Sequence, residues 1–219
     1  LNAGGNVDMQ KWLTQTKSLL HAWFPGQEGG KAVADILFGN VNPSGKLPAS
    51  FEKKWEDNPT FNNYYDADGD KRVSYKEDLN VGYRYYDLGK VKPQFPFGFG
   101  LSYTTFGYSD LKINSNGGTD VTVTFNIKNT GNYDGAEVAQ IYVRQPNSPV
   151  QRPVKELKGF DKVYLKKGES KTVTIKLDAD AFSYFKTEKN AFGYDTGTFE
   201  VIIGASAEDI KLRSEVNVK

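Results

Sequence analysis

Alternation of apolar and polar residues with a period of two dominates the second half of the chain. Five segments carry this pattern: 111–113, 121–127, 138–143, 172–177 and 197–204. Turn-forming residues separate these segments at 129–132, 166–169 and 195–197. Short alternating segments with regular turns are typical of antiparallel sheets that bury one face. The pattern therefore predicts an antiparallel β-sandwich over residues 103–219.

The first half of the chain shows a different pattern, in which strand-like and helix-like segments alternate. Apolar residues fall on one helical face at 31–38, and short apolar segments at 18–24 and 46–51 favour a buried parallel strand and an edge strand. Residues 1–8 are similar to a strand end that turns into a helix. This order predicts part of an α/β sheet. About fifty residues cannot cover both faces of such a sheet, so we expect the true chain to start upstream.

A run of aromatic residues alternating with small ones, residues 95–106, separates the two halves. Pro96, Gly98 and Gly100 interrupt the aromatic residues, and the run is too apolar for solvent and too interrupted for a helix. We expect an extended strap that is buried between two bodies and anchored by aromatic rings on both sides. The predicted domains are residues 1–94, the C-terminal half of an α/β sandwich domain, and residues 103–219.

Residues 52–94 show little periodicity but are rich in Asn, Asp and aromatic residues. A long irregular segment on a compact body is usually functional or disordered. Because aromatic residues can fix this one to the protein, we expect an ordered loop near a functional site.

Composition narrows the possible functions. The 219 residues include no cysteine and one histidine and carry a net charge of +1. Disulfides and thiolate metal sites are therefore excluded, and no nucleic-acid partner is indicated. No apolar run reaches membrane-spanning length, so we expect no membrane partner. We expect no cofactor. The redox compartment stays open, and a periplasmic or secreted location is favoured over a cytoplasmic one.

Two titratable residues have both a structural and a functional interpretation. His21 lies among apolar neighbours, where a hydrogen-bonded core histidine is favoured over a catalytic one. Glu28 lies at the start of the predicted helix, where an interaction with the helix dipole is favoured over a contact with a ligand.

The acidic segment 66–77 partly matches a calcium-binding loop. Asp66, Asp68, Asp70 and Glu77 occupy loop positions 1, 3, 5 and 12. Lys71 stands where the EF-hand requires glycine, and the flanking segments are not helical. An acidic surface turn is therefore favoured over a calcium site, and no metal site is predicted.

Several segments together resemble one enzyme family. They lie at 22–30, 35–39, 42–48, 81–86, 97–106, 129–131, 137–143 and 155–160. In this order, and over nearly the whole chain, they are similar to the C-terminal part of a glycoside hydrolase family 3 β-glucosidase. The resemblance implies the end of an α/β sandwich domain followed by an immunoglobulin/fibronectin type III-like β-sandwich.

The resemblance also implies a chemistry, namely retaining, exo-acting hydrolysis of terminal β-D-glucosyl residues, as in carbohydrate metabolism and cellulose degradation. Such enzymes use an Asp nucleophile on an N-terminal barrel-like domain and a Glu acid/base in the α/β sandwich domain. Both motifs would lie upstream of this chain, so it is assigned no catalytic residue. The implied partners are this upstream part, on the same or a separate chain, and a β-glucoside or oligosaccharide substrate; a homo-oligomer is possible.

The loop within residues 52–94 supplies candidates for shaping the entrance to the sugar site. Sugars present C–H faces that pack on rings and hydroxyls that need polar partners, and seven residues supply both: Trp55, Phe61, Tyr64, Tyr65, Asp78, Tyr83 and Arg84. The alternative is that these residues only attach the loop to the two domains. At the level of the whole chain, the alternative is an autonomous carbohydrate- or protein-binding β-sandwich module without catalysis.

Overall fold

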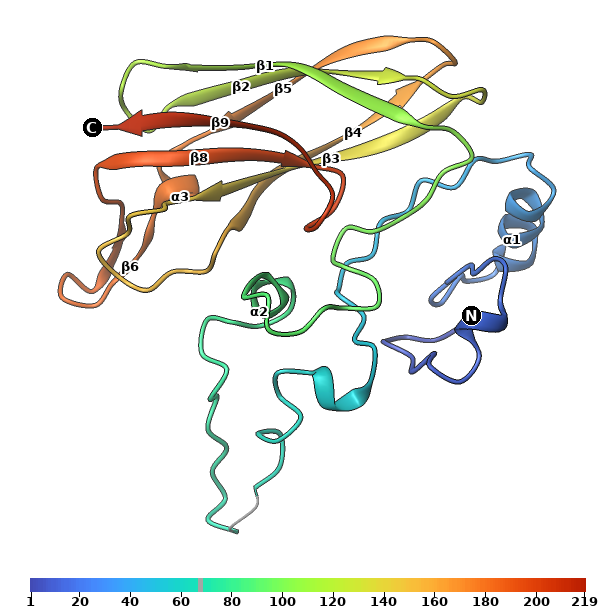
Figure 1. Ribbon diagram of the computed structural model, residues 1–219, viewed down its shortest axis with the longest axis horizontal. Helices are drawn as coiled ribbons and strands as arrows, with labels where there is room; N and C mark the ends of the chain where they lie inside the picture. Colours follow the sequence, from blue (N-terminus) through green and yellow to red (C-terminus); the bar gives the residue numbers. More distant parts are fainter. Residues whose placement is uncertain (67–68) are drawn as a thin grey trace.

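The computed structural model describes residues 1–66 and 69–219 (Figure 1). In chain order, with η for a 3₁₀ helix, the elements are η1 (Leu13–Gln15), α1 (Gly29–Leu37), η2 (Trp55–Asp57), α2 (Tyr83–Asp87), β1 (Phe106–Ser115), β2 (Val121–Asn129), β3 (Gly135–Arg144), β4 (Glu156–Leu165), β5 (Ser170–Leu177), α3 (Ala179–Phe182), β6 (Tyr184–Lys186), β7 (Ala191–Gly193), β8 (Gly197–Gly204) and β9 (Ile210–Val218). In the described ranges, none of the helices is long and apolar enough to cross a membrane.

Two antiparallel sheets form the predicted β-sandwich. One has the strand order β1-β2-β5 and the other β4-β3-β8-β9, and β6 and β7 form a separate small hairpin. The two sheets lie face to face (Figure 1), with β1 against β9 and β4 against β5 at the two sides. All five alternating segments of the sequence lie in strands, so this prediction is confirmed.

The alternation produces one continuous core between the sheets. In β2, Val121, Val123, Phe125 and Ile127 are buried, and the residues between them are more exposed. They pack with the inward-facing residues of the second sheet, which include Ile141, Val201 and Ile203, and with Phe182 and Phe199. Burial of these side chains is the main source of stability for the sandwich.

Besides the small β6–β7 hairpin, two strands of the sandwich, β4 and β9, lie outside the predicted segments. They form the two edges of the four-stranded sheet. In β4, charged residues interrupt the apolar pattern because solvent reaches an edge strand from several sides. In β9 the alternation of Ile210, Leu212, Val216 and Val218 is present in the sequence.

The four-stranded sheet also buries part of its outer face. Tyr142 in β3 and Ile202 in β8 point away from the core, yet both are almost fully buried. Tyr83, Phe97 and Leu157 pack against them. Three ion pairs also join the first half of the chain to the sandwich: Lys46–Glu137, Arg84–Glu156 and Asp87–Lys155. We call the outer cluster together with these ion pairs the seam.

The first half contains the predicted helix, observed as α1, but not the predicted strands. Within the described residues, 18–24 and 46–51 form no strand beyond a single bridge between Phe51 and Phe95. The Leu1 amine donates to the Leu20 carbonyl (2.7 Å) and the Ala22 amide donates to the Leu1 carbonyl (2.8 Å). This is the bond pattern of a parallel pair, but buried parallel strands need neighbours and covering helices that these residues do not have here. The helix expected after residue 8 is reduced to η1.

The strap contacts both bodies but is only partly buried. The Leu47 amide donates to the Phe99 carbonyl and the Gly98 amide to the Leu47 carbonyl, both at 2.8 Å. On the sandwich side, the Ala207 amide donates to the Phe97 carbonyl (2.9 Å). Leu101 is largely exposed, so the expectation of a fully buried strap was wrong at this end.

Two glycines make the close approach of the strap possible. A Cβ atom on Gly98, which has a φ of +81°, would lie 2.3 Å from the Gln140 side chain. A Cβ atom on Gly100 would lie 2.1 Å from the backbone carbonyl oxygen of Gly45. Any larger residue at position 100 would therefore push the strap away from the backbone beside it.

We predict that Gly100→Ala lowers the free energy of unfolding by more than about 1 kcal/mol, because the new methyl group meets backbone that cannot rotate away. Denaturant unfolding would measure the change. Gly118→Ala is the matched control, since a Cβ atom there meets nothing within 4 Å. Equal stability of the two variants would contradict the tight contact.

Candidate functional site

The irregular loop of residues 52–82 extends away from the sandwich and returns into α2 (Figure 1). Trp55 begins η2, and its ring contacts Phe61 edge-on with 6.2 Å between centroids. Tyr64 and Tyr65 form a second edge-on pair at 5.2 Å. The loop thus brings four of the candidate aromatic residues together as two pairs.

These pairs leave aromatic surface accessible. Trp55 is mostly exposed, and Tyr64 and Tyr65 are 69% and 73% exposed. Asp78 is also exposed and has a φ of +51°, in a turn where its amide donates to the Tyr75 carbonyl (3.2 Å). An exposed ring can pack on the C–H face of a sugar, and an exposed carboxylate can accept hydrogen bonds from its hydroxyls.

Tyr83 and Arg84 lie on α2, and their contacts are with the strap and the sandwich. The Tyr83 ring packs on Phe97 (5.1 Å) and Tyr142 (5.8 Å), and its hydroxyl oxygen accepts from the Leu157 amide at 2.8 Å. The Arg84 guanidinium donates to Glu156 at 3.1 Å. Both side chains therefore attach the base of the loop to the sandwich.

Three ion pairs, Lys46–Glu137, Arg84–Glu156 and Asp87–Lys155, join the first half of the chain to the sandwich. Lys46 donates to Glu137 at 3.1 Å, and the Tyr108 hydroxyl donates to the same carboxylate at 3.0 Å. Burial, together with the Glu137 charge, raises the pKa of Tyr108, so its phenol stays protonated. Like the other two ion pairs of the seam, Lys46–Glu137 joins one residue from the first half of the chain to one from the sandwich.

The most buried of these pairs joins Asp87 at the end of α2 to Lys155 just before β4. The Lys155 ammonium also lies 5.4 Å from the centroid of the Tyr142 ring. Burial raises the pKa of Asp87, and Lys155 opposes that rise. Among the described residues, Asp87 Oδ2 is buried without a hydrogen-bond partner. Lys155 is therefore the principal compensation for a buried carboxylate.

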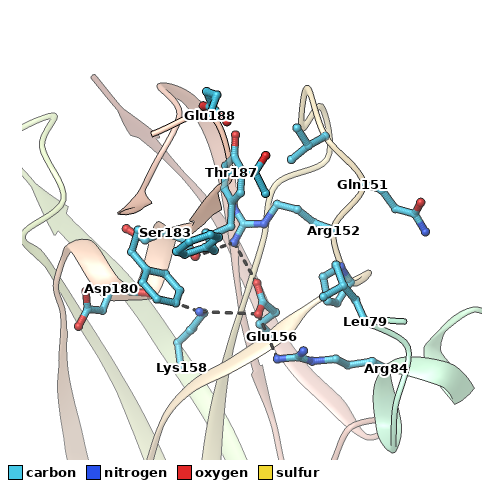
Figure 2. A pocket seen from close by; sticks show the side chains of 15 residues that line it. Leu79, Arg84, Gln151, Arg152, Glu156, Lys158, Asp180, Ser183, Thr187 and Glu188 are labelled. Carbon is cyan, nitrogen blue, oxygen red and sulfur yellow. Dashed lines mark hydrogen bonds and ion pairs between the residues drawn. The ribbon is translucent and has the colours of Figure 1, made fainter. Parts of the chain in front are cut away.

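A pocket of about 700 Å³ opens between α2, the loop before β4, α3 and the β6–β7 hairpin (Figure 2). Glu156 lies at its centre. One carboxylate oxygen accepts from Arg84 and lies 3.8 Å from the Lys158 ammonium; the other accepts from Arg152 at 2.9 Å. Burial first, and then Arg152 and Arg84, lower the pKa of Lys158, whereas Glu156 opposes the shift.

Of these pocket residues, sequence reasoning identified only Arg84. Arg152, Glu156 and Lys158 lie in or just before an edge strand, where scattered charges are ordinary. The segment 155–160 was noted for its resemblance alone, and no spacing rule relates it to α2, which lies about seventy residues earlier in the chain.

The acidic segment that resembles a calcium loop is folded around its own backbone where it is described. Asp66 accepts from the amides of Gly69 (2.7 Å) and Lys71 (2.8 Å), and Asp70 accepts from the Arg72 amide (2.7 Å). Asp68 lies outside the described residues. Within the described part of the chain, no group of three or more acidic, His or Cys residues is arranged to hold a metal ion. These amide contacts are typical of a surface turn.

His21 and Glu28 occupy the places that the sequence indicated. The His21 ring packs edge-on against Trp23 (4.3 Å) and Phe51 (5.4 Å). Burial, and after it the positive N-terminus, lowers the pKa of His21. Neither ring nitrogen has a hydrogen-bond partner among the described residues, so the packing role fits but the expected hydrogen bond was wrong. Glu28 is the exposed N-cap residue of α1, and in the described structure its side chain makes no capping bond.

Taken together, these features define a class of protein: a two-sheet antiparallel sandwich, joined by a tight seam to a segment that contains helix α1 and projects an aromatic loop. Comparison with known sequences agrees. Residues 1–103 match the glycosyl hydrolase family 3 C-terminal domain, and residues 137–207 match a fibronectin type III-like domain. The chain belongs to glycosyl hydrolase family 3 and corresponds to its C-terminal part.

Individual relatives support this assignment. The thermostable β-glucosidase B of Acetivibrio thermocellus is 47% identical over 98% of this chain. The crystal structure of β-glucosidase from Kluyveromyces marxianus in complex with glucose superimposes with a TM-score of 0.91 at 45% identity, covering 100% of this chain and 26% of that one. The crystal structure of the family 3 β-glucosidase of Bifidobacterium adolescentis gives a TM-score of 0.94 at 39% identity, and the match covers 99% of this chain and 32% of that one. The chain spans 28% of the length of the first of these relatives.

We predict that Lys155→Met lowers the free energy of unfolding by about 3–5 kcal/mol, because it leaves the buried Asp87 carboxylate without a cation. Denaturant unfolding would measure this loss. Adding Asp87→Leu to the same variant should recover much of it, since a buried ion pair can be replaced by apolar side chains at little cost.

Lys92→Met provides the control, because Lys92 pairs with Glu208 at the surface, 3.7 Å apart. It should change stability by less than about 1 kcal/mol. Equal effects of Lys155→Met and Lys92→Met would contradict the assigned role of Lys155.

Proposed function

We propose that this chain is the C-terminal portion of a retaining, exo-acting β-glucosidase. In this proposal the enzyme hydrolyses terminal β-D-glucosyl residues, and the upstream part supplies both the Asp nucleophile and the Glu acid/base. The observation that carries the proposal is the alignment of nearly the whole chain with proteins named β-glucosidases, at 39–47% identity for the three relatives described above.

The state of Glu156 supports placing the catalytic carboxylates elsewhere. Retaining hydrolysis needs two carboxyl groups roughly 5 Å apart, one to attack the sugar and one to transfer a proton. Glu156 is the carboxylate at the centre of the pocket, but both of its oxygens accept hydrogen bonds from arginine. A carboxylate held in this way is poorly placed to attack a sugar or to donate a proton.

In this proposal the upstream part covers an exposed apolar surface near α1. Phe24, Leu37 and Phe38 are large apolar side chains near α1, and all three are mostly exposed. Clusters of exposed apolar side chains are typical of surfaces that contact another part of a protein. We propose that upstream residues complete the α/β layer over this surface, with the two domains dividing between residues 94 and 103.

Within the proposed enzyme, the loop of residues 52–82 shapes the entrance to the sugar site. Trp55, Tyr64, Tyr65 and Asp78 supply the exposed contacts, and Phe61 supports the Trp55 ring. Tyr83 and Arg84 act from α2, where their contacts with Leu157 and Glu156 fix the base of the loop. The candidates thus divide into a contacting group and an anchoring group.

We predict that the 219-residue chain alone gives no turnover of an aryl β-glucoside above the buffer rate. The same chain joined to its upstream part should release the aryl group with retention of configuration, because the two catalytic carboxylates are then present. A chromogenic assay and NMR of the first-formed sugar anomer would measure rate and stereochemistry.

Turnover by the chain alone, abolished by replacing one of its own carboxylates, would overturn this proposal. Inversion by the joined enzyme would contradict the retaining mechanism while leaving the assignment to glucosidases intact.

We predict that Tyr64→Ala combined with Tyr65→Ala raises KM several-fold for glucosides with extended aglycones and changes kcat little. The two rings would bind the aglycone equally well in the ground state and in the transition state, so their loss weakens substrate binding without slowing the chemical step. Steady-state kinetics of the joined enzyme on a short and a long glucoside would measure both constants.

Tyr133→Ala is the matched control, since Tyr133 is 62% exposed but lies in the turn between β2 and β3. If KM and aglycone preference were the same in the double variant and the control, the entrance role would fail.

A further inference from the structure

The pocket beside β4 has a balanced charge. Its lining carries three cationic and three acidic side chains: Arg84, Arg152, Lys158, Glu156, Asp180 and Glu188. In Figure 2 the three cations surround Glu156, and we call these four residues the floor of the pocket; Asp180 and Glu188 lie farther from Glu156. Because the charges balance, neither an anion nor a cation is selected by the net field. The pocket instead offers both donors and acceptors.

The floor of the pocket is held rigidly. Arg152 is nearly buried and donates to the Phe182 carbonyl (3.0 Å) and the Ser183 carbonyl (3.4 Å) as well as to Glu156. Lys158 donates to the Asp180 carbonyl at 3.3 Å. These bonds join β4 and the loop before it to α3 and to the residue that precedes β6. The polar groups are therefore ordered before any ligand binds. Such pre-organisation lowers the entropic cost of binding.

Aromatic side chains of the β6–β7 hairpin form one wall. Phe185 and Phe192 pack edge-on at 5.5 Å, and Phe192 remains 75% exposed. The Tyr184 ring lies near the Arg152 guanidinium (5.3 Å), and its hydroxyl donates to Asp195 at 2.8 Å. The hairpin thus presents an exposed ring whose neighbours are fixed by hydrogen bonds.

We propose that this pocket binds a neutral oligosaccharide, with a sugar ring stacked on Phe192 and its hydroxyls bonded to Lys158, Arg84 and the carboxylates of Asp180 and Glu188. Pyranose rings present C–H faces, which suit an exposed aromatic ring. Their hydroxyls both donate and accept, which suits side chains of both charges. The volume lies in the range of small-molecule sites. Binding at this pocket involves no bond cleavage, so it does not depend on the proposed hydrolysis.

The test uses the intact protein that contains this chain. The ligand is a thio-linked cellotriose, whose sulfur bridges resist hydrolysis. Isothermal titration calorimetry is carried out with excess iminosugar present, so that any glucosidase active site is already occupied. We expect binding of one cellotriose per chain. Phe192→Ala should weaken this binding at least tenfold, and Lys158→Gln should weaken it several-fold.

Two matched controls locate the site. Phe160→Ala removes a ring that is 68% exposed on β4 but outside the pocket lining, and Lys162→Gln changes an exposed lysine of the same strand. Both should bind cellotriose as the parent protein does. Circular dichroism would check that each variant is folded.

Several results would overturn the proposal. These are the absence of any binding heat at millimolar cellotriose, an equal loss in Phe192→Ala and Phe160→Ala, and tighter binding of an acidic trisaccharide such as trigalacturonic acid. Aryl glucoside turnover, measured separately, decides the proposed hydrolysis, so the two proposals can fail independently.

Discussion

Burial of part of the outer face of the four-stranded sheet is the constraint on which the rest of the structure depends. A sheet in a two-layer sandwich can leave its outer face to solvent, but here Tyr142 and Ile202 are covered by Tyr83 and Phe97. Apolar burial attaches the first half of the chain without specifying its orientation. The ion pairs Lys46–Glu137, Arg84–Glu156 and Asp87–Lys155 add that orientation, because each needs a particular pair of atoms to meet.

The seam has two functional consequences. It fixes α2 and therefore the base of the aromatic loop, so that the exposed rings of Tyr64 and Tyr65 project from a supported segment. It also contributes Arg84 to the pocket beside β4, which makes that pocket a product of both halves of the chain. In the proposed enzyme, the sandwich supports the loop at the proposed sugar site, and the pocket beside β4 is a second, separately proposed sugar-binding site.

Much of this arrangement could be predicted from the sequence, and the limits have physical causes. The strands β2, β3, β5 and β8 were predictable because a buried inner face imposes a period of two, and α1 because Ala32, Val33, Ile36 and Leu37 share one helical face. The strands at 18–24 and 46–51 were not formed, because a parallel strand depends on neighbours that a local pattern does not supply. The cluster around Glu156 joins residues about seventy positions apart, so no local spacing could indicate it. Residue type supplied the aromatic loop candidates but did not distinguish Tyr64, which is exposed, from Tyr83, which is part of the seam.

Native-state amide hydrogen exchange of the intact protein tests most directly whether the seam and the sandwich form one cooperative unit. The relevant amides are those of Leu157, which donates to the Tyr83 hydroxyl oxygen, and Ala207, which donates to the Phe97 carbonyl. The account predicts that both exchange only through global unfolding, with the same opening free energy as amides of β3 that bond to β8. Exchange of Leu157 and Ala207 at least a hundredfold faster than those β3 amides would contradict it, since the seam would then open while the sandwich stays folded.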